Sequence, residues 1–117
     1  MGRLSTHVLD TAKGKPAAGV KIMLYRISGQ SHRKVKEVVT NADGRTDGPL
    51  LEGDTLEVGS YELVFCAGDY LRASGQAAEG VLFLDEIPIR FGVPDAAQHY
   101  HVPLLISPFG YSTYRGS

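Results

Sequence analysis

The stretch Ile87-Pro88-Ile89-Arg90-Phe91-Gly92-Val93 decides the fold class of this chain. Every second residue in it is large and apolar, and the residues between are not. In an extended chain a repeat of two places the apolar side chains on one face and the others on the opposite face. This is the clearest such pattern in the sequence, and it predicts a β-strand with one face against a core.

Shorter apolar runs of the same kind lie on both sides of this stretch, and glycine and proline turns separate them. The chain has 14 glycines and 6 prolines, and these residues are typical of turns between strands. Seven or eight short strands at this spacing predict an all-β sandwich. Strands are predicted over residues 3–9, 20–25, 34–40, 61–65, 87–93, 98–106 and 110–115, and one short helix over residues 69–78, with Asp69 as its N-cap.

Length and charge limit the classes of protein to consider. A chain of 117 residues is predicted to form a single domain, residues 1–117. Lys and Arg number 12 and Asp and Glu 13, so the formal net charge is −1. This balance gives no electrostatic reason to expect nucleic acid or an anionic membrane as a partner. No export signal and no long apolar run is present, so a cytoplasmic protein is expected.

The only cysteine, Cys66, excludes an intrachain disulfide and a cysteine-based zinc site. Its neighbours Leu63, Val64, Phe65 and Ala67 are apolar. We therefore expect a buried thiol at this position and not a catalytic nucleophile.

Two histidines are predicted to face away from the core. In the strands expected over 3–9 and 98–106 most even-numbered residues are apolar, while His7 and His101 are odd-numbered. Either one alone is typical of a surface histidine. His99 and His101 also form a pair two residues apart that is able to bind a metal. No Asp, Glu or Cys in that strand completes the ligand set, so no metal site is predicted.

Arg45 directly follows the turn signal Asn41–Gly44. It is interpreted either as a solvated loop arginine or as a residue that recognises carboxylates and polarised carbonyls through its planar guanidinium. The sequence ends in Tyr114-Arg115-Gly116-Ser117, a dense set of hydrogen-bonding groups. Tyr114 and Arg115 are interpreted either as residues of a frayed end or as part of a site.

Other polar residues are given structural interpretations. Asp10, Asp43 and Asp47 are predicted to form turns, and His32 to lie in a polar loop. No nucleophile elbow, phosphate loop or Rossmann glycine fingerprint is present. The residues alone thus predict a β-sandwich with two outward histidines and a loop arginine, and they do not name a substrate.

These same residues carry a resemblance to a known family. Across essentially its full length the chain resembles the transthyretin-related 5-hydroxyisourate hydrolases. The segments that carry it are Leu4–Thr11, Gly14–Val20, Asn41–Arg45, His99–Pro108 and Tyr111–Ser117. The closing Tyr-Arg-Gly-Ser is the most specific of them, because transthyretin itself lacks that ending and the catalytic histidines.

The resemblance implies a fold, an assembly and a site. The fold is a transthyretin-like (prealbumin-like) sandwich of two four-stranded sheets with one short helix. The assembly is a homotetramer, a dimer of dimers with active sites between the dimers, and no metal or organic cofactor is required. The implied catalytic residues are His7, Arg45 and His101, and the implied substrate-binding residues are His7, Arg45, Tyr114, Arg115, Gly116 and Ser117.

The implied reaction is the hydrolytic opening of the six-membered ring of 5-hydroxyisourate to 2-oxo-4-hydroxy-4-carboxy-5-ureidoimidazoline, in urate degradation. Histidines suit its proton transfers because their ordinary pKa lies near 6.5. Arg45 is too basic to carry protons and suits charge stabilisation. Which histidine acts as the base, and whether His99 has a role, stay open. The chain departs from the family pattern at Val81–Asp85, which leaves the conformation of that loop open.

A second class of function fits the same fold. The stretches Gly19–Ile22 and Gly59–Leu63 also resemble prealbumin-like adhesion or carrier domains. Such a domain holds a small ligand without reaction, and fold alone does not separate the two classes. The combination of His7, Arg45, His101 and the closing Tyr114–Ser117 favours the hydrolase, because a carrier does not need it.

Overall fold

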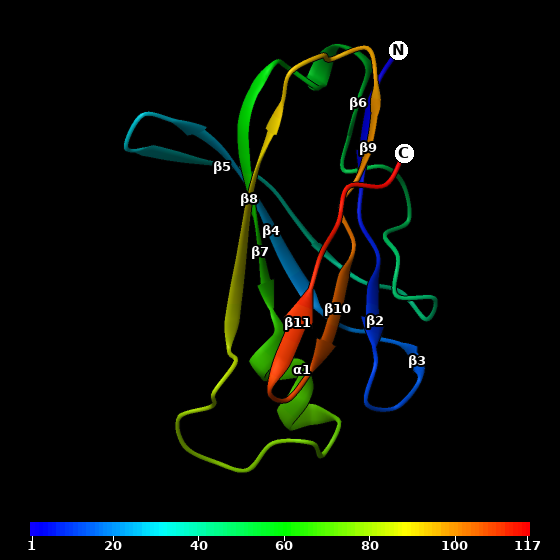
Figure 1. Ribbon diagram of the computed structural model, residues 1–117, viewed down its shortest axis with the longest axis vertical. Coiled ribbons are helices and arrows are strands. Elements are labelled where there is room, and N and C mark those ends of the chain that lie inside the picture. Colours follow the sequence, from blue (N-terminus) through cyan, green and yellow to red (C-terminus); the bar gives the residue numbers. More distant parts are fainter.

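Alternating apolar residues build the first layer of the molecule. The computed structural model describes residues 1–117, and four long strands form one antiparallel sheet in the order β5-β4-β7-β8 (Figure 1). They are β4 (Lys21–Ser28), β5 (Ser31–Val39), β7 (Gly59–Cys66) and β8 (Glu86–Val93). Their inward residues include Ile22, Leu24, Leu63, Phe65 and Ile87, all of which are buried.

The second layer is built on two parallel pairs of short strands. β1 (Arg3–Ser5) pairs with β9 (His99–His101), and β2 (Val8–Asp10) pairs with β10 (Leu104–Ser107). Shorter strands complete this layer as a three-stranded sheet, β6-β1-β9, and a four-stranded sheet, β11-β10-β2-β3. These shorter strands are β3 (Lys15–Pro16), β6 (Leu51–Glu52) and β11 (Gly110–Ser112). A 3-10 turn, Gly53–Thr55, directly follows β6.

The predicted sandwich is confirmed, but two of its strands are interrupted. The strands expected over 3–9 and 98–106 are each divided, the first at Thr6–His7 and the second at Val102–Pro103. Pro103 has no N–H to give to a ladder. The buried Thr6 hydroxyl donates to the Val102 carbonyl at 2.7 Å, in the gap between the two sheets. The chains stay side by side across the gap, so the second layer remains one face of the sandwich.

The single α-helix, α1 (Ala67–Ala73), differs in its bounds from the prediction of 69–78. Cys66 is the N-cap residue, so Asp69 was wrongly predicted as the cap and lies in the first turn. A carboxylate there still complements the positive end of the helix dipole. The helix ends early because Ser74 and Gly75 follow it, and Gly75 takes a positive φ of 76°. No helix in this structure is long and apolar enough to cross a membrane.

Asp10 was predicted to form a turn, and the structure shows that it does more. It is buried, and its carboxylate accepts hydrogen bonds from Tyr70 Oη at 2.6 Å, Gln76 Nε2 at 2.9 Å and the Lys13 N–H at 2.9 Å. Burial alone raises the pKa of Asp10, but these hydrogen bonds outweigh it and lower the pKa below its ordinary value. The cluster ties α1 to β2 and so fixes one end of the second layer.

Cys66 is buried, as predicted. Burial is the main cause that raises the pKa of its thiol. Since the thiolate is the reactive form, this environment does not suit a nucleophile.

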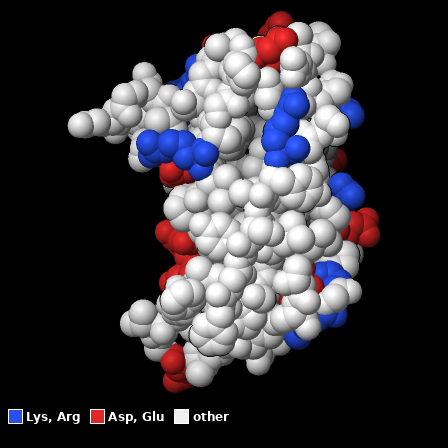
Figure 2. All heavy atoms as spheres, in the orientation of Figure 1, with Lys and Arg blue, Asp and Glu red and all other residues white.

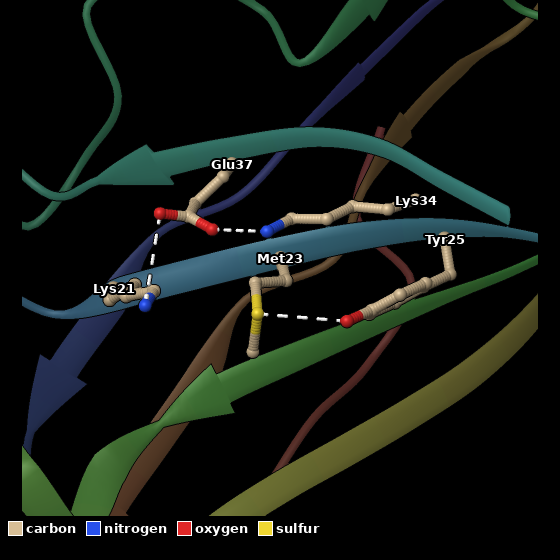
Figure 3. Close-up of polar contacts among 5 residues, drawn as sticks. All are labelled: Lys21, Met23, Tyr25, Lys34 and Glu37. Atoms are coloured by element: carbon tan, nitrogen blue, oxygen red, sulfur yellow. Dashed lines mark hydrogen bonds and ion pairs between the residues drawn. The ribbon is translucent and has the colours of Figure 1, made fainter.

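The outer face of β4 and β5 is polar and solvated. Glu37 lies between Lys21, at 3.8 Å, and Lys34, and the Tyr25 hydroxyl points at the Met23 sulfur (Figure 3). Exposed ion pairs of this kind contribute little to stability. His32 lies in β5 and not in a loop as predicted, and its Nε2 is 3.1 Å from Arg90 Nη2. His32 and Arg90 both belong to the first sheet, through β5 and β8, whereas His7 and His101 belong to the second layer.

Candidate active site

Parallel pairing in the second layer brings His7 and His101 together. Ser5 lies opposite His101 in the register of β1 and β9, and His7 follows two residues later on the same face. The two imidazole rings have centroids 6.4 Å apart and planes inclined by 46°. Both residues are half-buried. The prediction that both face away from the core is confirmed.

A tight turn places Arg45 beside His7. The two residues form an isolated antiparallel bridge, and the Val8 N–H donates to the Gly44 carbonyl at 2.8 Å. Gly44 has a φ of 74°, and a Cβ built on it lies only 2.3 Å from the Val8 carbonyl oxygen. Glycine is therefore required for the turn to lie this close to β2.

The closing segment reaches the same place through Gly116. Gly116 and His101 exchange both backbone hydrogen bonds, at 2.7 and 3.2 Å. A Cβ at Gly116 lies 3.1 Å from the Cβ of His101 and 3.2 Å from its Cδ2, which is tighter than ordinary packing. The backbone of this segment thus lies directly against His101.

The side chains beside Gly116 point in different directions. The Arg115 guanidinium donates to Gln98 Oε1 at 3.0 Å and to the His99 carbonyl at 3.1 Å, and it stacks on the Tyr100 ring at 4.7 Å. Tyr114 and Ser117 are exposed. Of the predicted site residues, the structure brings together four, namely His7, Arg45, His101 and Gly116.

The two histidines have different hydrogen-bond partners. His7 Nε2 is 2.9 Å from the Asp43 carbonyl oxygen, and His101 Nδ1 is 2.9 Å from Ser5 Oγ. Burial, followed by the positive charge of Arg45 and the charge that His7 carries when protonated, lowers the pKa of His101 below its ordinary 6.5. At pH 7 His101 is therefore mainly neutral and able to accept a proton.

A polar hollow of about 260 Å³ lies beside this group and is lined by Ser5 and Arg45. Neither histidine lines the hollow itself, but its lining residue Ser5 contacts His101 and its lining residue Arg45 bridges to His7, so the hollow lies next to the two histidines. Our sequence reasoning missed Arg3, Ser5 and Thr46 as lining residues. Arg3 and Ser5 share the odd-numbered face with His7, and that signal was sufficient to find them. The remaining lining residues are Thr6, Gly48 and Pro49.

A larger hollow of about 560 Å³ lies elsewhere, between β5 and residues 49–57. The Arg26 guanidinium in it already donates to the Val58 carbonyl at 2.7 Å and stacks on Tyr61. Lys36 Nζ likewise donates to the Leu50 carbonyl at 3.3 Å. Two of the three cations that line this hollow, Arg26 and Lys36, are thus bonded to the protein's own carbonyls, and no histidine lines it. The smaller hollow, which lies beside His101, is the better candidate site. His99 is exposed, and the structure contains no group of three or more His, Cys, Asp or Glu side chains placed to hold a metal.

The fold and the site define a β-sandwich with two histidines and an arginine on the outward face of one layer. Residues 4–116 match the model of the HIUase/Transthyretin family. The chain belongs to that family. A 5-hydroxyisourate hydrolase of Rhizobium meliloti is 60% identical over 116 residues, which cover 99% of this chain and 97% of that protein.

Solved structures agree with this family. A 5-hydroxyisourate hydrolase of Klebsiella pneumoniae matches with a TM-score of 0.83 and 36% identity, over 100% of both chains. A crystal structure of (S)-allantoin synthase matches with a TM-score of 0.93 and 49% identity. That match covers 99% of this chain and 44% of the other, so the chain spans less than half the length of that protein.

The substitution Arg45→Gln is predicted to raise the pKa of His101. It removes a positive charge that opposes protonation, while burial remains and keeps the pKa below its ordinary value. NMR titration of the histidine ring signals measures this shift. Arg115→Gln is the matched control, because the Arg115 guanidinium bonds to Gln98 and His99 and does not act on His101. An unchanged His101 titration in Arg45→Gln, or an equal shift in both variants, contradicts the prediction.

Proposed function

We propose that residues 1–117 act as one hydrolase domain that opens the ring of 5-hydroxyisourate with water. The observation that carries this proposal is the constellation of His7, Arg45 and His101 beside a polar hollow. The 60% identity to a relative of that name over nearly the whole of both chains supports the substrate. A cytoplasmic location stays a prediction.

The proposed reaction needs a proton acceptor, a proton donor and a stabiliser of negative charge. The oxygen of water bonds to a ring carbonyl carbon while one histidine accepts its proton. The carbon–nitrogen bond then breaks, and the leaving nitrogen takes up a proton, so the net change is the addition of one water. We assign the proton transfers to His7 and His101, and such steps contribute roughly 10²–10⁴-fold in rate. The lowered pKa of His101 suits it to move protons near pH 7.

Arg45 is assigned to the developing negative charge. A guanidinium stays protonated near pH 7 and offers a planar set of donors to carbonyl oxygens. The bridge to His7 holds its backbone at the site while its side chain remains exposed. We further propose that Tyr114, Arg115, Gly116 and Ser117 line the substrate. The pairing of Gly116 with His101 supports this, and the stacking of Arg115 on Tyr100 anchors the segment.

A non-catalytic carrier is the alternative on this fold. A carrier has no need of two histidines held 6.4 Å apart with an arginine beside them. The hydrolase therefore accounts for more of what the structure contains.

The activity is tested by generating 5-hydroxyisourate in place with urate oxidase and following the loss of its absorbance. The wild-type chain is expected to exceed the spontaneous decay seen without it. His101→Ala is expected to lose roughly 10²–10⁴-fold of the rate, whereas the control His32→Ala, which changes a histidine of the other sheet, keeps it. If the wild-type chain does not exceed spontaneous decay, the proposed function is wrong.

We also propose a homotetramer in which the histidine faces meet between dimers. Leu9 and Leu105 lie opposite one another in register on the face that carries His7, and both are half-buried in the single chain. β8 and β11 are each the edge of their sheet, and both lie toward the viewer in Figure 1. Figure 2 shows few charges over the middle of that side. An unpaired strand edge is a template for pairing with another chain, so these edges suit the contact within each dimer.

Leu105→Arg is expected to reduce the assembly from four chains to two, because it places a charge in the face proposed to lie between dimers. Light scattering on a size-exclusion column measures the mass, and circular dichroism checks that the β-structure is retained. Val39→Arg is the matched control, since Val39 is an exposed apolar residue at the end of β5 in the other layer. If Leu105→Arg stays at four chains, or if the wild-type chain elutes as a monomer, this assembly is contradicted.

A further inference from the structure

The turn that carries Arg45 is closed by one side chain, that of Asn41. Its Oδ1 accepts the N–H of Asp43 at 2.9 Å and the N–H of Arg45 at 3.2 Å. Its backbone adds two more hydrogen bonds, from its N–H to the Arg45 carbonyl at 2.8 Å and from the Gly44 N–H to its carbonyl at 2.9 Å. The conformation of residues 41–45 therefore depends on Asn41.

The same turn fixes a proton on His7. The Asp43 carbonyl oxygen lies 2.9 Å from His7 Nε2. A carbonyl oxygen only accepts hydrogen bonds, so Nε2 must carry the hydrogen. In the neutral ring Nδ1 then carries no hydrogen, and it is the one nitrogen of His7 that can accept a proton.

His101 is held in a different manner. Its Nδ1 faces the hydroxyl of Ser5 at 2.9 Å, and a hydroxyl both donates and accepts. Ser5 is therefore able to remain the partner of His101 in either tautomer. Of the two histidines, only His7 is restricted to one tautomer by its partner.

We infer that Asn41 is a positioning residue that holds His7 in its Nε2–H tautomer and Arg45 in place through this one turn. The inference rests on the proposed function for its effect on rate, but its structural part does not. Asn41 contacts neither imidazole itself. It acts through the Asp43 carbonyl and the Arg45 backbone, and its Nδ2 donates to Asp47 Oδ1 at 3.1 Å, which orients the amide.

The chain offers a matched pair of variants to test this role. Asn41→Ala removes the acceptor of both backbone N–H groups. The double substitution Asn41→Asp with Asp47→Asn keeps an acceptor at position 41 and a donor at position 47, and it conserves the net charge. The first variant is expected to lose the restriction on His7, and the second to retain it.

The direct readout is the tautomer of His7, measured by long-range proton–nitrogen NMR on histidine-labelled protein. The chain has only four histidines, and a His7→Gln variant identifies the signal. At a pH about two units above the ordinary histidine pKa, wild type and the double variant are expected to show the Nε2–H form alone. Asn41→Ala is expected to show a mixture of both tautomers, with unchanged signals from His32 and His99 as a check of the fold.

The second readout is the rate of hydrolysis. Because small displacements of reacting groups cost up to about a hundredfold in rate, kcat is expected to fall roughly 10–100-fold in Asn41→Ala and to recover in the double variant. A His7 that stays wholly in the Nε2–H form in Asn41→Ala overturns the inference. So does a double variant that fails to restore the tautomer. A mixed tautomer with an unchanged kcat confirms the hold on the His7 tautomer and overturns the role of Asn41 in the rate. An inactive wild-type protein overturns the proposed function instead, and the tautomer measurement still decides the structural role of Asn41.

Discussion

The parallel pairing of the N-terminal strand with the strand over residues 99–107 is the interaction on which the rest of this structure depends. It joins residues 96 positions apart in the sequence, as in the bond from the Thr6 hydroxyl to the Val102 carbonyl. Where the strands are interrupted, the Val102 N–H donates to the Ser5 carbonyl at 2.9 Å and the Leu104 N–H to the His7 carbonyl at 2.8 Å. The register thus survives the interruption, and with it the distance between His7 and His101.

Two close backbone approaches then complete the site. Gly44 lets the Arg45 turn lie on β2, and Gly116 lets the closing segment lie on His101. A side chain is excluded at Gly44, where the φ is 74° and a Cβ lies 2.3 Å from the Val8 carbonyl oxygen, and it is tightly fitted at Gly116, where a Cβ lies 3.1 Å from the Cβ of His101. The result places a cation and a second backbone segment beside two imidazoles, in a setting that lowers the pKa of His101. These are the requirements of a hydrolytic site that works with protein groups at neutral pH.

Much of this arrangement was predictable, because strand alternation acts locally. The outward direction of His7 and His101 followed from a repeat of two, and the same argument extends to Ser5. The interruptions were not predicted: Pro103 was a local signal for one of them, but the bond from the buried Thr6 hydroxyl to the Val102 carbonyl joins residues 96 positions apart. Asp10 was misjudged for the same reason, since Tyr70 and Gln76, which bond to it, lie far along the chain. The direction of Arg115 depends on stacking with Tyr100. Local sequence patterns also do not identify a substrate. The substrate was inferred from the resemblance to a known family.

The central claim is that the strand pairing makes His7 and His101 one catalytic unit. The most direct test is a double-mutant cycle on the rate of 5-hydroxyisourate hydrolysis, with His7→Ala, His101→Ala and the variant that carries both. Groups that act as a unit give losses that do not multiply. We predict that the double variant has about the same kcat as the slower single variant. A kcat lowered by the product of the two separate losses would show independent roles and contradict the account.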